Sequence, residues 1–168
     1  SVQELGRLYT RALYNSRLER GVVQYPDANS TLRLTYGTVG SFVRDGKPTP
    51  WQTMSGEILA KENTAMHDFC LKANWRKLLR KAVKNKKQIP VNFITDNDIT
   101  GGNSGSPVLN GKGEIIGLAF DGNKESLAGD VYWVPEYTKC VCVDIRFVLW
   151  TLKEYAGMNY LLDEMELK

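Results

Sequence analysis

The stretch that decides the expected fold and chemistry is Gly101-Gly102-Asn103-Ser104-Gly105-Ser106-Pro107. Two glycines lead into a serine, a third glycine follows it, and the apolar pair Val108-Leu109 indicates the start of a strand. Glycine permits backbone angles and close approaches that a side chain would block. The pattern therefore predicts a tight turn that presents the hydroxyl of Ser104 just ahead of a strand.

The spacing within this turn suits a nucleophile. A serine that attacks an acyl carbon needs two backbone N–H groups aimed at the oxygen that becomes negative in the tetrahedral intermediate. Gly102 and Ser104 are two positions apart, so one sharp turn can direct both amides into a small hole. We predict Ser104 as nucleophile and the Gly102 and Ser104 amides as its oxyanion hole. Because the motif is short, a glycine-rich hairpin corner without chemistry stays an alternative.

A longer run resembles a known family. Residues 95–110, TDNDITGGNSGSPVLN, and the later GLAFDGN at 117–123 resemble the nucleophile region of bacterial exo-acting dipeptidyl peptidases with a chymotrypsin-like fold. This family contains dipeptidyl peptidases VII and XI. The resemblance resumes at Tyr25-Pro26-Asp27-Ala28-Asn29 and at Cys142-Val143-Asp144-Ile145-Arg146. It implies a serine exopeptidase acting on peptides with a free N-terminus, in a full-length protein that is homodimeric and periplasmic or at the cell surface.

The composition is that of an ordinary globular domain, with 168 residues, 42% hydrophobic and 24% charged. The net charge of +3 does not indicate nucleic-acid binding. The basic run 72–87 interleaves apolar residues at helical spacing, which favours a helix with a solvated basic face over an anion-binding surface. No apolar run approaches the ~18 residues of a membrane span, and no signal peptide opens the chain. Since it begins inside a helical pattern, we expect the chain to be part of something larger.

Hydrophobic periodicity predicts helices at both ends of a β-rich region. Residues 2–18 repeat apolar side chains every three or four positions, and Gly21 supplies a stop. From Thr31 the period becomes two, which predicts a half-buried strand. Asp144 is expected to cap a last helix that ends at Gly157. Between them we expect a strand near 51–59, helix within 62–84, and short strands at about 91–95, 106–109, 114–120, 131–134 and 139–143.

Seven short strands without repeats or βαβ alternation favour an antiparallel barrel within a mainly β fold with flanking helices. The family resemblance makes this the second antiparallel β-barrel of a chymotrypsin-like, double-barrel serine peptidase, closed by a C-terminal helix. Residues 1–21 would then be the exit of an inserted helical domain. Residues 22–168 would form the C-terminal barrel half of the peptidase.

The resemblance also assigns two substrate-binding positions. Asp121 matches the residue that binds the substrate's α-ammonium. A carboxylate held at a fixed distance from the nucleophile would place the bond after the second residue at the serine. Gly122 matches a position that carries arginine in members preferring an acidic residue before the cleaved bond (P1), and glycine in members preferring a hydrophobic one. We therefore predict an open, uncharged pocket and a hydrophobic P1, as in dipeptidyl peptidase VII. Without the resemblance, Asp121-Gly122 is a common turn pair.

The chain lacks an evident general base. A serine nucleophile needs one, normally a histidine oriented by an acid. The single histidine, His67, lies in a predicted helix outside any triad motif and is interpreted as a surface or packing residue. The resemblance places the triad histidine and aspartate upstream, so the expected partners are the missing N-terminal barrel and helical domain, and the fragment alone is expected to be inactive.

No cofactor or metal is expected, because His67 and the cysteines form no ligand set. We interpret Cys70, Cys140 and Cys142 as small buried hydrophobes, the last two on one face of a strand. Two other functions stay open. A glutamyl endopeptidase-like protein also displays GNSGSP but needs its histidine and aspartate nearby. A non-catalytic β-barrel binding module would keep a peptidase fold with an idle serine.

Overall fold

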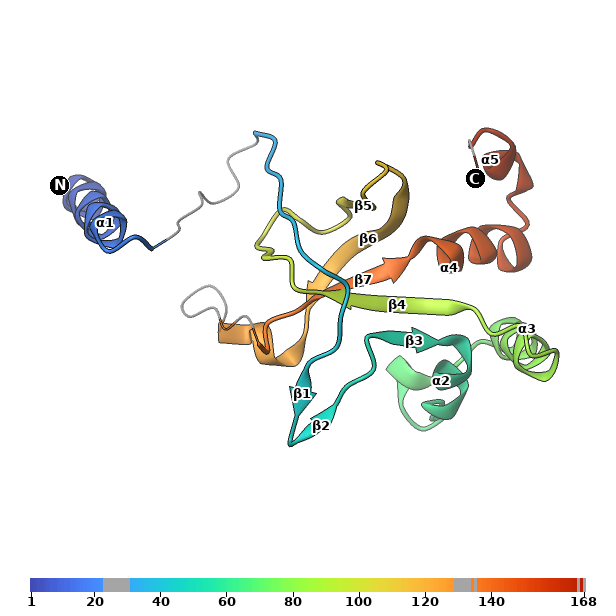
Figure 1. Cartoon of the computed structure of the whole chain (residues 1–168). Helices are drawn as coiled ribbons and strands as arrows, with labels where there is room; N and C mark the ends of the chain where they lie inside the picture. The colour runs from blue at the N-terminus through green and yellow to red at the C-terminus, as the bar shows by residue number, and fades with distance from the viewer. Residues whose placement is uncertain (23–30, 129–133, 135, 166, 168) are drawn as a thin grey trace. The chain divides into compact units, whose positions relative to one another are not determined.

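The computed structural model describes residues 1–22, 31–128, 134, 136–165 and 167, which belong to two compact units (Figure 1). The first unit, Ser1–Arg33, contains one helix. The second, Leu34–Lys168, contains the sheet and every other helix of the described residues. The stretch Tyr25-Pro26-Asp27-Ala28-Asn29 and most of the strand predicted at 131–134 lie outside the described residues.

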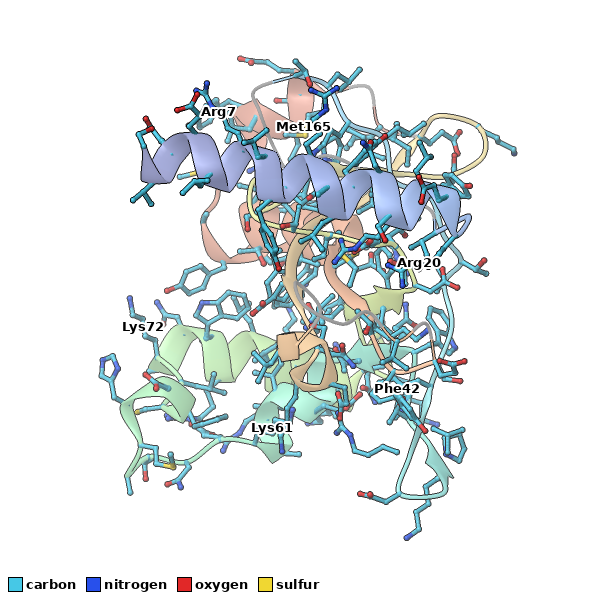
Figure 2. All side chains as sticks on the ribbon, turned by 90° about the vertical axis from the view of Figure 1, so that its left-hand side faces the viewer. Arg7, Arg20, Phe42, Lys61, Lys72 and Met165 are labelled. Carbon is cyan, nitrogen blue, oxygen red and sulfur yellow. The ribbon has the colours of Figure 1, made fainter. Side chains whose placement is uncertain are left out.

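The helix of the first unit, α1 (Val2–Glu19), confirms the helix predicted at 2–18. The Ser1 hydroxyl caps it by accepting the Glu4 amide at 3.3 Å, and Gly21 leaves it with a φ of +68°. Its side chains surround the helix, with Arg7 and Arg20 marked in Figure 2. None of its residues is buried, so its apolar stripe faces outward within the described residues.

The second unit is built on an antiparallel sheet with the strand order β3-β4-β7-β6-β5. Its strands are β3 (Gln52–Met54), β4 (Pro90–Thr95), β5 (Pro107–Leu109), β6 (Ile115–Gly122) and β7 (Cys140–Asp144). Strands β4 to β7 confirm four of the predicted strands. Burial alternates along β4 and β7, so one face of the sheet carries the core.

The sheet of the described residues is open, with β3 and β5 as its edges, so the expected closed barrel is not seen. The coarser prediction, a mainly β fold with flanking helices, holds. Residues 31–36 form no strand in the described part of the chain, and Leu32, Leu34 and Tyr36 are 88–100% exposed. The chain first pairs with the sheet at an isolated bridge from Val39 to Thr95. Alternation alone cannot make a strand when no neighbour pairs with it.

The strand predicted near 51–59 is shorter than expected because a helix begins inside it. Ser55 is fully buried and exchanges hydrogen bonds with Ile89, giving its amide to the carbonyl at 2.9 Å and accepting the Ile89 amide on its hydroxyl at 3.1 Å. The Glu57 carboxylate accepts the Met54 amide at 2.8 Å, which satisfies a free donor at the start of α2 (Ser55–Ala60). These contacts end β3 at Met54. Before β3, a small hairpin joins β1 (Val43–Arg44) to β2 (Lys47–Pro48).

The core lies on one face of the sheet around Phe93, Ala119, Cys140 and Cys142. Gly117 allows the Phe93 ring to approach β6, since a Cβ at 117 would lie 2.7 Å from the ring and 2.5 Å from a β7 carbonyl oxygen. As predicted, the thiols of Cys140 and Cys142 lie on the same face. Their sulfurs are 3.6 Å apart, at hydrogen-bond distance, and form no disulfide.

The third cysteine corrects the prediction that all three are buried. Cys70 is exposed, because it follows the short 3₁₀ turn η1 (His67–Phe69) rather than a core strand.

Helices lie at the end of the sheet where β4 begins and β7 ends (Figure 1). In α3 (Ala73–Lys84), Leu79 and Ala82 are buried, while Trp75 stacks on Phe147 and Tyr155. Asp144 caps α4 (Ile145–Trp150) as predicted, accepting the Arg146 amide at 2.9 Å. The helix continues through η3 (Thr151–Tyr155) and stops at Gly157, where φ is +65°, before α5 (Asn159–Asp163). Among the described helices, none has the length and apolar character that a bilayer crossing requires.

Candidate active site

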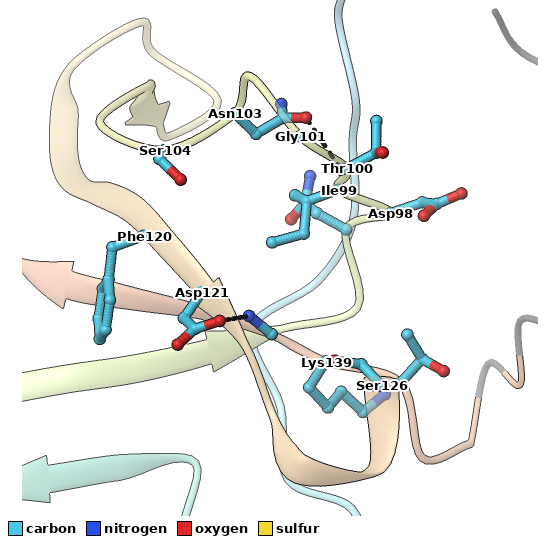
Figure 3. A pocket seen from close by; sticks show the side chains of 13 residues that line it. Asp98, Ile99, Thr100, Gly101, Asn103, Ser104, Phe120, Asp121, Ser126 and Lys139 are labelled. Carbon is cyan, nitrogen blue, oxygen red and sulfur yellow. Dashed lines mark hydrogen bonds between the residues drawn. The ribbon is translucent and has the colours of Figure 1, made fainter. Parts of the chain in front are cut away.

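A single pocket of about 230 Å³ brings together Ser104, Asp121 and Gly122 (Figure 3). Figure 3 shows Ser104, Phe120 and Asp121 along one side and Asp98, Ile99 and Thr100 along the other, with Ser126 and Lys139 at the base of the view. The other predicted site residue, Gly102, lies in the same loop but is not part of the pocket wall among the described residues.

The loop that carries Ser104 is held on both sides of the serine. Asn103 ties the loop to Thr100, accepting the Thr100 amide on its side chain and donating its own amide to the Thr100 carbonyl, both at 3.1 Å. After the serine, the Gly105 amide donates to the Ala119 carbonyl of β6 at 2.7 Å, and the Ala119 amide returns a bond to Ser106 at 2.9 Å. The loop is therefore anchored to the sheet while Ser104 itself stays exposed.

The two amides predicted as an oxyanion hole take no part in these bonds. Gly102 and Gly105 have φ angles of +100° and +82°, which non-glycine residues rarely adopt, so the turn around Ser104 depends on glycine. Within the described residues, neither the Gly102 nor the Ser104 amide donates a hydrogen bond to another backbone group. The loop geometry thus leaves two amides available beside an exposed hydroxyl.

A β-bulge turns Asp121 toward the pocket. In the pairing of β6 with β7, Ala119 lies opposite Cys142, but Asp121 lies opposite Val141, so Phe120 is an extra residue. Without the bulge, Asp121 would keep the phase of Gly117 and Ala119 and would face the core. The bulge instead leaves its carboxylate exposed, with Oδ1 accepting the Gly122 amide at 2.8 Å.

The space beside Gly122 is smaller than the sequence suggests. A Cβ at this position would come well under 3.0 Å from the hydroxyl of Ser126, closer than real Cβ atoms approach. Ser126 lies in η2 (Lys124–Ala128), and its hydroxyl donates to the Asn123 carbonyl at 2.7 Å. The volume that a side chain at 122 would take is therefore occupied by a neighbouring serine.

The described residues bring no histidine to Ser104. His67 is fully exposed on η1, 3.4 Å from the equally exposed Asp68, and neither residue lines the pocket. This agrees with its interpretation as a surface residue. Within the described ranges, His, Cys, Asp and Glu side chains form no group that could hold a metal ion.

Sequence reasoning missed part of the pocket. The segment 97–100 forms one wall, although the sequence assigned it no role of its own and marked it only as part of the family resemblance at 95–110. Ser126 and Lys139 were also missed, because they reach the pocket from a 3₁₀ turn and from the residue before β7 rather than from a local motif. Asn123 links these two residues, because its side chain accepts the Lys139 amide at 2.9 Å and its carbonyl accepts the Ser126 hydroxyl at 2.7 Å.

Comparison with known proteins gives the family. The profile of peptidase S46 matches residues 1–167. The chain belongs to this family. It is 40% identical to dipeptidyl-peptidase 7 of Capnocytophaga gingivalis over 95% of its own length and 23% of that protein, and 45% identical to dipeptidyl-peptidase 7 of Phocaeicola vulgatus over 83% and 20%.

A solved relative has the same fold. Porphyromonas endodontalis DPP11 in complex with the dipeptide Arg-Asp superposes with a TM-score of 0.79 at 33% identity, over 86% of this chain and 22% of that one. The chain therefore spans about a fifth of the length of the relatives it matches. The resemblance noted from the sequence is confirmed at the level of the family.

Proposed function

We propose that this chain is the C-terminal part of a serine dipeptidyl peptidase, in which it supplies the nucleophile, the oxyanion hole and a substrate-binding carboxylate. The observation that carries the proposal is the convergence of Ser104 and Asp121 on one pocket, beside two amides with no backbone partner in the described residues. Membership of the peptidase S46 family supports the same function.

In the proposed reaction, the Ser104 oxygen attacks the carbonyl carbon of the second substrate residue, and a base removes the hydroxyl proton. The carbonyl oxygen becomes negative and accepts hydrogen bonds from the Gly102 and Ser104 amides. The base then returns its proton to the departing amine as the peptide bond breaks. Water hydrolyses the ester that remains on Ser104, which releases the dipeptide and restores the hydroxyl.

Asp121 is proposed to measure the dipeptide. Its exposed carboxylate lies in the same pocket as Ser104, so it can bind the α-ammonium of a free N-terminus while the second carbonyl reaches the serine. A charge-assisted hydrogen bond of this kind contributes about 1.5–3 kcal/mol. Asp121→Asn should therefore raise KM by about 10- to 100-fold and affect kcat less. Equal turnover of free and acetylated peptides by the wild type would contradict this role.

We propose a hydrophobic P1 residue, as the sequence suggested. The absence of a side chain at Gly122, the presence of Phe120 in the wall and the relatives named dipeptidyl-peptidase 7 support this preference. An acidic P1 is the rival, because Lys139 lines the pocket and is only 8% exposed, and because the solved DPP11 relative carries Arg-Asp. Comparing the release of Xaa-Leu and Xaa-Phe with that of Xaa-Asp and Xaa-Glu separates the two.

The general base is proposed to come from an N-terminal barrel elsewhere in the full-length protein. In this arrangement α1 is the last segment of a helical domain inserted between the two barrels. The exposure of His67 and the coverage of about a fifth of each relative support this arrangement. The isolated chain should then be nearly inactive, and adding the separately produced upstream part should restore dipeptide release. By family resemblance we also propose a homodimeric full-length protein in the periplasm or at the cell surface, to be checked by sedimentation and cell fractionation.

The decisive experiment uses the full-length protein with dipeptidyl coumarin substrates whose N-termini are free or acetylated. Ser104→Ala should abolish release, while Ser106→Ala, a serine in the same loop outside the pocket wall, should keep most of it. Cleavage of acetylated peptides after glutamate would instead indicate a glutamyl endopeptidase. Peptide binding without any turnover would indicate a binding module. Either result would overturn the proposed function.

A further inference from the structure

The corner of the pocket beside Gly122 is closed by the side chain of Ser126, which is not one of the predicted substrate-binding residues. Gly122 and Ser126 both line the pocket, and the Ser126 hydroxyl stands where a Cβ at 122 would project. The φ of Gly122 is not in the left-handed region, so backbone conformation does not demand glycine here. What excludes a side chain at 122 is the hydroxyl of Ser126.

Ser126 is fixed in this position by its neighbours. Both its hydroxyl and its amide donate to the Asn123 carbonyl, at 2.7 and 2.9 Å. Asn123 is in turn paired with Lys139, the residue before β7, donating its amide to the Lys139 carbonyl and accepting the Lys139 amide on Oδ1, both at 2.9 Å. An ion pair from Arg44 to Glu125, 2.6 Å long, holds the same turn from the β1–β2 hairpin. The hydroxyl is therefore a fixed part of the pocket.

We infer that Ser126 is a specificity-determining residue that sets the depth of the P1 pocket. The inference rests on the proposed function and adds the residue that limits P1 size. Since Gly122 provides no side chain, a P1 side chain entering beside it would meet the Ser126 hydroxyl at the end of the pocket. A change of one methylene in such a pocket alters kcat/KM by about 10- to 200-fold.

The inference predicts opposite effects for smaller and larger residues at 126. Ser126→Gly should lengthen the pocket and raise the ratio of kcat/KM for P1 tryptophan over P1 alanine by about 10-fold. Ser126→Leu should shorten it and lower the same ratio by 10-fold or more. Lys124→Ala is the matched control, because Lys124 is exposed in the same turn and does not line the pocket.

The contact also couples the two positions. Gly122→Ala alone should lower the melting temperature, because its Cβ would displace a hydroxyl that Asn123 holds. In the Ser126→Gly background the obstructing atoms are gone, and the same substitution should cost little. A double-mutant cycle of melting temperatures reads this coupling without any substrate.

The test measures P1 profiles and melting temperatures of the full-length wild type, the two Ser126 variants, the Lys124 control and the Gly122 cycle. Opposite shifts of the tryptophan-to-alanine ratio, with the control unchanged, would support the inference. An active wild type whose ratio stays within twofold in both Ser126 variants would refute it while leaving the proposed function intact. A wild type that releases no dipeptide would refute the proposed function, and this inference with it. Should Ser126→Leu fail to fold, the ratio for Ser126→Gly decides alone.

Discussion

Asn123 is expected to hold Ser126 and Lys139, two residues that line the pocket, in place, and its replacement tests this role quantitatively. Its side chain makes hydrogen bonds to Glu125 at 2.8 Å, to the Tyr137 carbonyl at 2.7 Å and from the Lys139 amide at 2.9 Å. Asn123→Ala removes all of them. It leaves the amide of Lys139, a buried residue, without that acceptor.

The expected loss follows from these bonds. Each of the three bonds contributes about 1 kcal/mol net, so Asn123→Ala should lower the free energy of unfolding by about 3 kcal/mol. With a urea slope of about 2 kcal/mol per molar for a chain of this size, the unfolding midpoint should fall by about 1.5 M. If the turn opens locally instead, the Lys139 amide should exchange its hydrogen about 100-fold faster.

The assay combines urea unfolding followed by circular dichroism with site-resolved hydrogen exchange. Asn123→Asp is the matched control, because a carboxylate can still accept the Lys139 amide but cannot donate to Glu125 or Tyr137. It should keep Lys139 protected and lose only part of the stability. A midpoint within about 0.3 M of wild type, together with unchanged exchange at Lys139, would show that Asn123 does not hold this part of the structure.

Two further predictions test the core. Gly117→Ala should lower the free energy of unfolding by about 1–3 kcal/mol and the melting temperature by roughly 5 °C, because its methyl group would meet a β7 carbonyl and an aromatic ring. The control Gly111→Ala, whose methyl group meets nothing within 4 Å, should be nearly neutral, and equal melting temperatures for the two variants would contradict the close approach at Gly117. Iodoacetamide at pH 8 should modify the exposed Cys70 quickly in the native chain but should reach the buried Cys140 and Cys142 only in urea. The hydrogen bond with the Cys140 thiol and, to a smaller extent, burial also raise the pKa of Cys142, so rapid labelling of more than one thiol, measured by mass spectrometry, would contradict this prediction.

Local signals predicted the parts of the fold that depend on neighbouring residues. Helix α1, the capping of α4 by Asp144 and the strands β4 to β7 follow from periodicity and end signals that act within a few residues. The strand expected at 31–36 failed because a strand needs a partner, and partners are chosen across the whole chain. The extent of β3 failed for a similar reason, since Ser55 pairs with Ile89, which lies far along the sequence.

The candidate site shows the same division. The glycine-rich motif located Ser104, and the family resemblance located Asp121 and Gly122, all in one pocket. The bulge at Phe120 has no signature in an alternating sequence, yet it decides which way Asp121 points. Ser126 was hidden as well, because its importance lies in a contact with Gly122 that appears only after the turn folds back.

The bulge decides which face of β6 carries Asp121. Side chains alternate between the faces of a strand, so one extra unpaired residue exchanges those faces for everything beyond it. If Phe120 were paired regularly, Asp121 would fall into phase with Ala119 and its carboxylate would point toward the two buried thiols, whereas deleting Phe120 would remove the bulge and leave Asp121 opposite Val141. The position of the proposed substrate-binding carboxylate thus depends on a match between the number of residues in β6 and the pairing register of β7, and not on the side chains alone.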